Sequence, residues 1–211
     1  MKKFELTSEF ITNVFGVKLF RIRALIEFGD VKAGDLGGYI EKEENLDHDG
    51  NAWVTGNARV SGNATVSGNA WVTGNARVSG NAWVYGDARV GGDATVTGNA
   101  RVSGDATVSG NAWVYGDARV GGDATVTGNA TVSGNARVYG DADYATVKGF
   151  GRCNRNTTFF RCKDGKVRVV CGCFFGDMEE FRAIINRTHG DGKLAKEYLA
   201  IADLMEMHFW R

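Results

Sequence analysis

The chain has 211 residues, with 25 acidic and 25 basic side chains, so its formal net charge is zero. This balance gives no global argument for nucleic acid or an anionic membrane surface as a partner. No apolar run approaches the ~20 residues that cross a bilayer, and the opening MKKFELTSEF lacks the apolar stretch typical of a secretory signal. All four cysteines lie within residues 153–173, unlike a disulfide scaffold, so we expect a cytoplasmic protein, in a host cell or associated with a virion.

Residues 1–49 are ordinary mixed sequence and are expected to form an N-terminal cap. VKLFRIRALIEF at 17–28 alternates enough to predict a strand, and GDLGGYIEKEENL at 34–46 could lead into the next segment.

Residues 50–139 are fifteen consecutive hexads of the form Gly-(Asn/Asp)-Ala-x-Val-x, and GNAWVTGNARVSGNA at 50–64 returns three hexads later, at 68–82. Within a hexad, Ala and Val are separated by one residue, so both point to the same side of a strand. The residue between them, which is Trp, Arg or Thr, points the other way. The following x-Gly-Asn stretch is turn chemistry, because Gly and Asn tolerate positive φ. Three hexads of strand and turn therefore predict one triangular coil with an apolar interior.

These hexads resemble those of the left-handed parallel β-helix family, including members encoded by phages and prophages. Val54 and Ala58 fit the aliphatic and small positions of the family motif, and the match continues through Val132 and Ala136. The resemblance implies a mainly β fold of about five 18-residue coils over residues 50–145, and a homo-oligomer, with a trimer favoured.

Stacking every third hexad sorts the outward side chains into three columns. The first contains Trp53, Trp71, Arg89, Thr107 and Thr125; the second contains Arg59, Arg77, Thr95, Trp113 and Thr131; the third contains Thr65, Trp83, Arg101, Arg119 and Arg137. Stacked Arg side chains repel unless an anionic group, a phosphate or a neighbouring subunit's carboxylate, lies over them. Trp83, Arg101, Arg119 and Arg137 are therefore the candidate ligand-binding residues. Trp53, Trp71, Arg89 and Trp113 are the candidate interface residues, because flat faces with exposed aromatic rings suggest subunit contacts.

A second internal repeat argues against a specific binding pocket formed by these side chains. GNAWVYGDARVGGDATVTGNA occurs at 80–100 and again at 110–130, displaced by five hexads, which is not a whole number of coils. The copy therefore falls on a different face, and the prism is expected to serve mainly as a spacer or scaffold.

Residues 146–211 are expected to form a small ββαα module that covers the open end of the stack. Tyr144, at the Val position of an incomplete sixteenth hexad, would close the narrow core. Asp164-Gly165 predicts a two-residue hairpin turn that pairs Cys162 with Val167. Asp177 and Glu180 form a capping-box pattern for a helix ending near His189, and a second helix is expected from about Lys193 to His208.

The hairpin register would place three cysteines on one face. Cys162, Cys171 and Cys173, with His189, are then candidate zinc ligands, although the spacing of the cysteines from Cys153 onward is not a standard zinc pattern. Buried free thiols facing a small core are the alternative.

Three functions remain open. The leading one is a non-enzymatic phage- or prophage-type scaffold or interaction protein that oligomerises through its faces and uses no cofactor, with a protein partner at the C-terminal module. The second is a small-ligand binder that sequesters an anionic signalling nucleotide in intersubunit grooves, as an anti-defence protein would. The third is a hexapeptide-repeat acyltransferase, disfavoured because such enzymes use a catalytic His near the coils, and the hexads contain none; His48 precedes the first coil.

Overall fold

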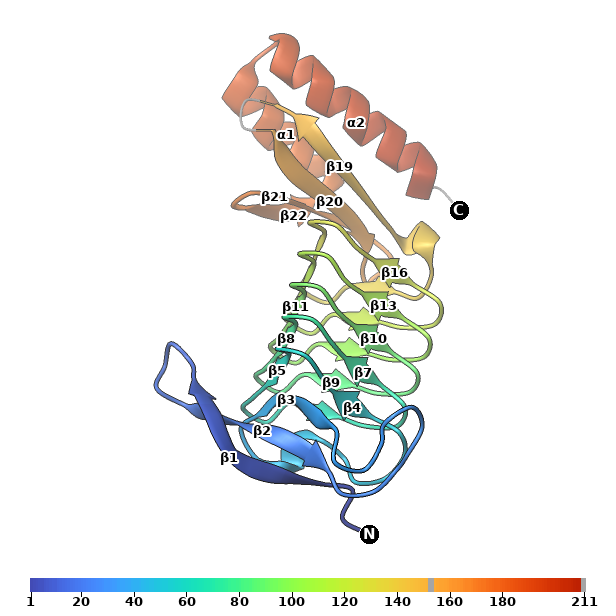
Figure 1. Cartoon of the computed structure of the whole chain (residues 1–211). Helices are drawn as coiled ribbons and strands as arrows, with labels where there is room; N and C mark the ends of the chain where they lie inside the picture. The colour runs from blue at the N-terminus through green and yellow to red at the C-terminus, as the bar shows by residue number, and fades with distance from the viewer. Residues whose placement is uncertain (152–153, 210–211) are drawn as a thin grey trace.

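The computed structural model describes residues 1–151 and 154–209. A stack of coils forms the middle of the molecule, with the N-terminal strands at one end and a sheet with two helices at the other (Figure 1). Neither described helix is long and apolar enough to cross a membrane.

Each hexad contributes one two-residue strand, formed by its outward residue and its Val. Face 1 contains β4 (Trp53–Val54), β7 (Trp71–Val72), β10 (Arg89–Val90), β13 (Thr107–Val108) and β16 (Thr125–Val126). Face 2 contains β5 (Arg59–Val60), β8 (Arg77–Val78), β11 (Thr95–Val96), β14 (Trp113–Val114) and β17 (Thr131–Val132). Face 3 contains β6 (Thr65–Val66), β9 (Trp83–Val84), β12 (Arg101–Val102), β15 (Arg119–Val120) and β18 (Arg137–Val138). Neighbouring strands on a face pair in parallel, each residue with its equivalent three hexads further along the chain, so the three predicted columns are confirmed.

The interior is the predicted Val and Ala lining. Every Val and Ala of the fifteen hexads is at most 1% exposed. One coil alone could not bury this surface, so stability arises from stacking. The corners between faces are turned by the hexad glycines, and the backbone of each coil bonds to the next, as where the Asn111 N–H donates to the Gly128 carbonyl over 2.7 Å.

The N-terminal segment forms an additional coil beneath the first hexad. β1 (Phe4–Thr12), β2 (Lys18–Ala24) and β3 (Leu36–Ile40) pair antiparallel, and β3 then pairs in parallel with β5 of face 2. After the 3-10 turn η1 (Glu43–Asn45), Leu46 bridges to Val66 of face 3. The expectations of a strand within 17–28 and of a lead-in at 34–46 are confirmed, whereas β1 was not predicted.

The open bottom of the stack is closed by Lys3. Its side chain is buried, and its ammonium donates to the carbonyls of Ala52 (3.0 Å) and Gly50 (3.2 Å) while lying 4.8 Å from the Phe28 ring centre. Burial lowers the pKa of Lys3 to about 8, although Asp47 and Asp49 act in the opposite direction. A charged donor therefore satisfies backbone carbonyls at the lower end of face 1, where the sheet ends at β4.

The top of the stack is covered by a four-stranded antiparallel sheet. It follows the 3-10 turn η2 (Asp141–Asp143) and contains β19 (Tyr144–Phe150), β20 (Arg155–Arg161), β21 (Val167–Cys171) and β22 (Phe174–Asp177) in that order. The helices α1 (Met178–His189) and α2 (Lys193–Phe209) follow, and Asp177 caps α1 with the predicted capping box. The two helices and the hairpin are confirmed, but the sheet also contains β19 and β22, which the ββαα interpretation did not include.

Phe160 is the large ring that closes the core. It is completely buried and joins the Val and Ala cluster together with Cys162 and Val170. Tyr144, predicted for this role, is only half-buried, and its hydroxyl donates to the Thr125 carbonyl over 2.6 Å.

The predicted register of the β20–β21 hairpin is wrong by one residue. Val167 pairs with Arg161 rather than with Cys162, and the Cys162 N–H donates to the Lys166 carbonyl over 2.9 Å. The loop is therefore longer than the predicted two-residue turn, with Gly165 at φ 77°, the arrangement in which a turn is followed by a left-handed bulge residue. Because side chains alternate along a strand, a slip of one residue changes which β21 side chains share a face of the sheet with which β20 side chains.

Candidate anion-binding site

The four candidate ligand residues lie in one groove on face 3. Trp83, Arg101, Arg119 and Arg137 line a groove of about 660 Å³ together with Asn81, Asn99, Asp117, Asn135 and Lys163. We call this the arginine groove. Its floor is the row of strands β9, β12, β15 and β18, whose register aligns Arg101 with Arg119 and Arg119 with Arg137.

The side chains at the two ends of the groove are held by local contacts. The Arg101 guanidinium lies 5.4 Å from the Trp83 ring centre, a cation–π contact. Arg137 donates to the carbonyls of Ala136 (2.8 Å) and Asp117 (3.1 Å). Arg119 lies between them and, like Arg101, is exposed.

One wall of the groove is a ladder of amides. The Asn81 amide donates to Asn99 over 3.1 Å, and the Asn99 amide donates to Asp117 over 2.9 Å. Lys163 lies in the β20–β21 loop, and its backbone N–H donates to the Asn135 carbonyl over 3.1 Å, which fixes that loop against the upper end of the groove.

The groove has a strong positive charge. Three arginines and Lys163 face the single carboxylate of Asp117, and within the described residues none of these four cations forms an ion pair. At a strand spacing of ~4.8 Å, two like charges repel by about 1 kcal/mol in water and by more where solvent is excluded. An anion lying across the arginines would relieve this repulsion.

The coils that form this groove match a known repeat family. Residues 58–74, 72–86, 88–102, 100–116 and 118–134 each match the YdcK beta solenoid repeat. The chain is a β-solenoid repeat protein. The comparison with curated proteins found no match.

The four candidate interface residues of the solenoid do not form one surface. Trp53 is 2% exposed because Phe28 of the N-terminal segment packs edge-on against it at 5.4 Å, so its assignment to a subunit interface is wrong. Trp71 is half-buried, and Arg89 is exposed beside it on face 1. Trp113 is 54% exposed but lies on face 2, in a cavity of about 570 Å³ with Tyr115 and Val170.

The candidate zinc ligands are separated by the sheet of the C-terminal module. Cys162 packs against the solenoid core, and burial raises the pKa of its thiol to about 11. Cys171, Cys173 and His189 line a different cavity, of about 360 Å³, on the helix side of the sheet. Among residues 1–151 and 154–209, no group of three His, Cys, Asp or Glu side chains is close enough to hold a metal ion. The predicted shared face is wrong because of the register slip, and Cys153 lies outside the described residues.

His48 is built into the N-terminal cap. Its Nδ1 accepts from the Lys3 N–H at 3.2 Å, its Nε2 contacts a Glu43 carboxylate oxygen at 2.7 Å, and its ring stacks on Phe4 at 4.4 Å. The hydrogen bond from His48, together with Lys2, holds the pKa of Glu43 below its usual value. These contacts give both ring nitrogens a role in holding the cap together.

The sequence interpretation identified the arginines of the groove but not its walls. Asn81, Asn99 and Asn135 share one hexad position, so the stacking that aligned the arginines could also have aligned them. Lys163 had no such signal, because it comes from a loop outside the repeat.

Proposed function

We propose that this β-solenoid is a non-enzymatic interaction scaffold that binds anionic groups in the arginine groove. The observation that carries the proposal is the aligned set of Arg101, Arg119 and Arg137, joined by Lys163, with no ion pair for any of them within the described residues. Guanidinium groups are well suited to phosphate and carboxylate oxygens, because their planar donors match that geometry.

The uninterrupted repeat supports a scaffold role. No loop leaves the stack between Gly50 and Tyr139, and the hexads contain no histidine. A stack of short strands with a close-packed interior is a stiff spacer between the cap and the C-terminal module. Phage or prophage origin and a protein partner at the C-terminal module remain predictions.

The test is calorimetric titration with inorganic tripolyphosphate, a linear polyanion, in low salt. Arg119→Ala should weaken binding about tenfold, in line with the loss of one charged hydrogen-bonding group. Arg77→Ala is the matched control, because Arg77 occupies the same hexad position on face 2 and, like Arg119, is exposed. Equal effects of the two substitutions, or no binding by the unaltered protein, would contradict the proposal.

A second candidate function is the binding of an anionic aromatic ligand such as a nucleotide. Trp83 favours it, because its ring is 51% exposed at the lower end of the same groove, next to Arg101. A base stacked on this ring, with its phosphates toward Arg119, would use both kinds of contact. ATP should then bind more tightly than tripolyphosphate, and Trp83→Ala should remove the difference. Trp113→Ala, at an equally exposed tryptophan on face 2, should leave it intact.

A further inference from the structure

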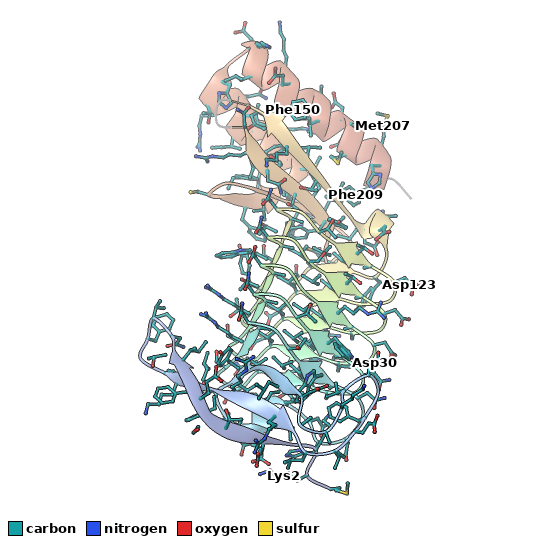
Figure 2. All side chains as sticks on the ribbon, viewed as in Figure 1. Lys2, Asp30, Asp123, Phe150, Met207 and Phe209 are labelled. Carbon is teal, nitrogen blue, oxygen red and sulfur yellow. The ribbon has the colours of Figure 1, made fainter. Side chains whose placement is uncertain are left out.

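The C-terminal module contains a cavity of about 360 Å³ between its sheet and its two helices, and we call it the C-terminal cavity. Its lining is mainly apolar and includes Phe174, Phe181, Ile184, Ile185 and Tyr198. Figure 2 labels Phe150 at the end of β19 beside the helices, and its carbonyl oxygen accepts a hydrogen bond from the Tyr198 hydroxyl over 3.5 Å. A concave apolar cavity of this size is typical of a small-molecule site.

The aromatic rings of the C-terminal cavity already contact one another in the arrangements that aromatic pairs prefer. The Phe181 ring centre lies 5.5 Å from that of Phe174, with the rings tilted by 41°, and 6.0 Å from that of Tyr198, edge-on at 84°. The His189 ring stacks on Tyr198 with the ring centres 6.0 Å apart. A planar ring placed among them would make further contacts of the same kind. The lining therefore favours an aromatic ligand.

Arg155, at the start of β20, is the residue of the described lining that carries a permanent charge. Its guanidinium packs over Gly172 in the β21–β22 turn, and a Cβ at Gly172 would collide with Arg155 Nη1. Within residues 1–151 and 154–209, Arg155 forms no ion pair, and no Asp or Glu lines the cavity. An apolar cavity thus has a cation at its edge that no described acidic side chain neutralises.

We propose that the C-terminal cavity binds a small aromatic carboxylate, with its ring among Phe174, Phe181 and Tyr198 and its carboxylate on Arg155. Aromatic linings also attract cations, but Arg155 repels a cation and attracts an anion, so the charge of the lining decides the sign of the ligand. A guanidinium donates two parallel hydrogen bonds to a carboxylate, which fixes the orientation of the ring. This site is separate from the arginine groove, and the inference does not rest on the proposed function.

Cys173 reports whether the C-terminal cavity is occupied. Its thiol is exposed and lines the cavity. Cys162 belongs to the solenoid core on the other side of the sheet, so a ligand in the cavity does not cover it. A bound ligand should therefore slow the reaction of Cys173 with iodoacetamide, and this rate measures occupancy independently of any heat of binding.

Calorimetric titration of the full chain with 2-naphthoate tests the inference, and 2-naphthamide is the uncharged probe of the same shape. The unaltered protein should bind 2-naphthoate about tenfold more tightly, in line with one hydrogen-bonding contact to a charged group. Arg155→Ala should remove this preference. Ile184→Trp should abolish binding of both probes, because the indole fills the cavity while Arg155 remains in place. Saturating 2-naphthoate should slow the modification of Cys173 in the unaltered protein but not in Ile184→Trp.

Arg187→Ala is the matched control, since Arg187 is exposed on α1 and does not line the cavity. Circular dichroism of each variant establishes that the chain is folded. Excess tripolyphosphate should leave 2-naphthoate bound, because a polyanion does not fit the apolar cavity. Displacement by tripolyphosphate, equal affinity for the two probes, unchanged binding in both Arg155→Ala and Ile184→Trp, or no binding by the unaltered protein overturns the inference. The titration of Arg119→Ala with tripolyphosphate remains the separate test of the proposed function.

Discussion

Gly110 and Gly128 turn the same corner of successive coils, and their replacement by alanine separates backbone strain from the contact between coils. Both have positive φ, 66° and 67°. A Cβ on Gly110 would lie 2.8 Å from the Gly128 carbonyl oxygen and 2.9 Å from the Gly128 nitrogen, whereas a Cβ on Gly128 would meet nothing within 4 Å. Both substitutions therefore strain the backbone, and only Gly110→Ala also introduces a clash with the adjacent coil.

The shared cost is the left-handed conformation, which is ~1–2 kcal/mol for an L residue. Gly110→Ala adds the clash, and relief of the clash lengthens the hydrogen bond from the Asn111 N–H to the Gly128 carbonyl. Overpacking of this kind adds ~1–3 kcal/mol. We therefore expect Gly128→Ala to lower the free energy of unfolding by about 1–2 kcal/mol, and Gly110→Ala by about 2 kcal/mol more.

Urea unfolding followed by far-UV circular dichroism measures both variants, with tryptophan fluorescence as a second probe and equal m-values as the condition for comparison. Overpacking is expected to cost ~1–3 kcal/mol. A difference below about 0.5 kcal/mol between the two variants would refute the argument that contact with the adjacent coil excludes a Cβ at the corner positions.

Three further predictions concern the ends of the stack. Phe160→Ala should lower the free energy of unfolding by ~3–5 kcal/mol, because the completely buried ring closes the top of the core; urea unfolding measures it. Iodoacetamide at pH 8 should modify exposed Cys173 well before Cys162, whose buried thiol has its pKa raised to about 11; peptide mass spectrometry resolves the two, and equal rates would contradict the burial of Cys162. The folded chain lowers the pKa of Lys3 to about 8 from 10.5, so between these pH values the unfolded chain binds more protons and the Lys3 contribution to stability rises with pH. Urea unfolding from pH 8 to pH 10 should show this rise relative to Lys3→Met; parallel profiles for the two proteins would contradict it.

The repeat itself could be predicted because its contacts recur at one separation. Every hexad Val meets the equivalent Val of the adjacent coil, and every outward side chain meets the one in the same place on that coil. The period of the sequence therefore predicts the strand pairing, the residues of the apolar interior and the three outward columns together. The capping box at Asp177 was equally local, since both partners lie within one helical turn.

The tertiary structure decided what happens where the repeat ends. The local sequence around Asp164-Gly165 is compatible with either a shorter or a longer hairpin loop. The burial of Phe160 and Cys162 against the last coil selects the longer loop. The sequence showed Trp53 as an outward residue, and only the return of the N-terminal chain places Phe28 over it.

The arginine groove was likewise predictable from the sequence only in part. The alignment of Arg101, Arg119 and Arg137 follows from the repeat, because parallel strands with a fixed register stack identical positions. Lys163 and the closure of the upper end depend on the docking of a hairpin from outside the repeat. Sequence alone thus determined the coil, its interior and its columns of charge, since these rest on regularly spaced contacts. Only the folded chain decided which side chains are covered and which remain open to a partner, since those contacts join segments that share no period.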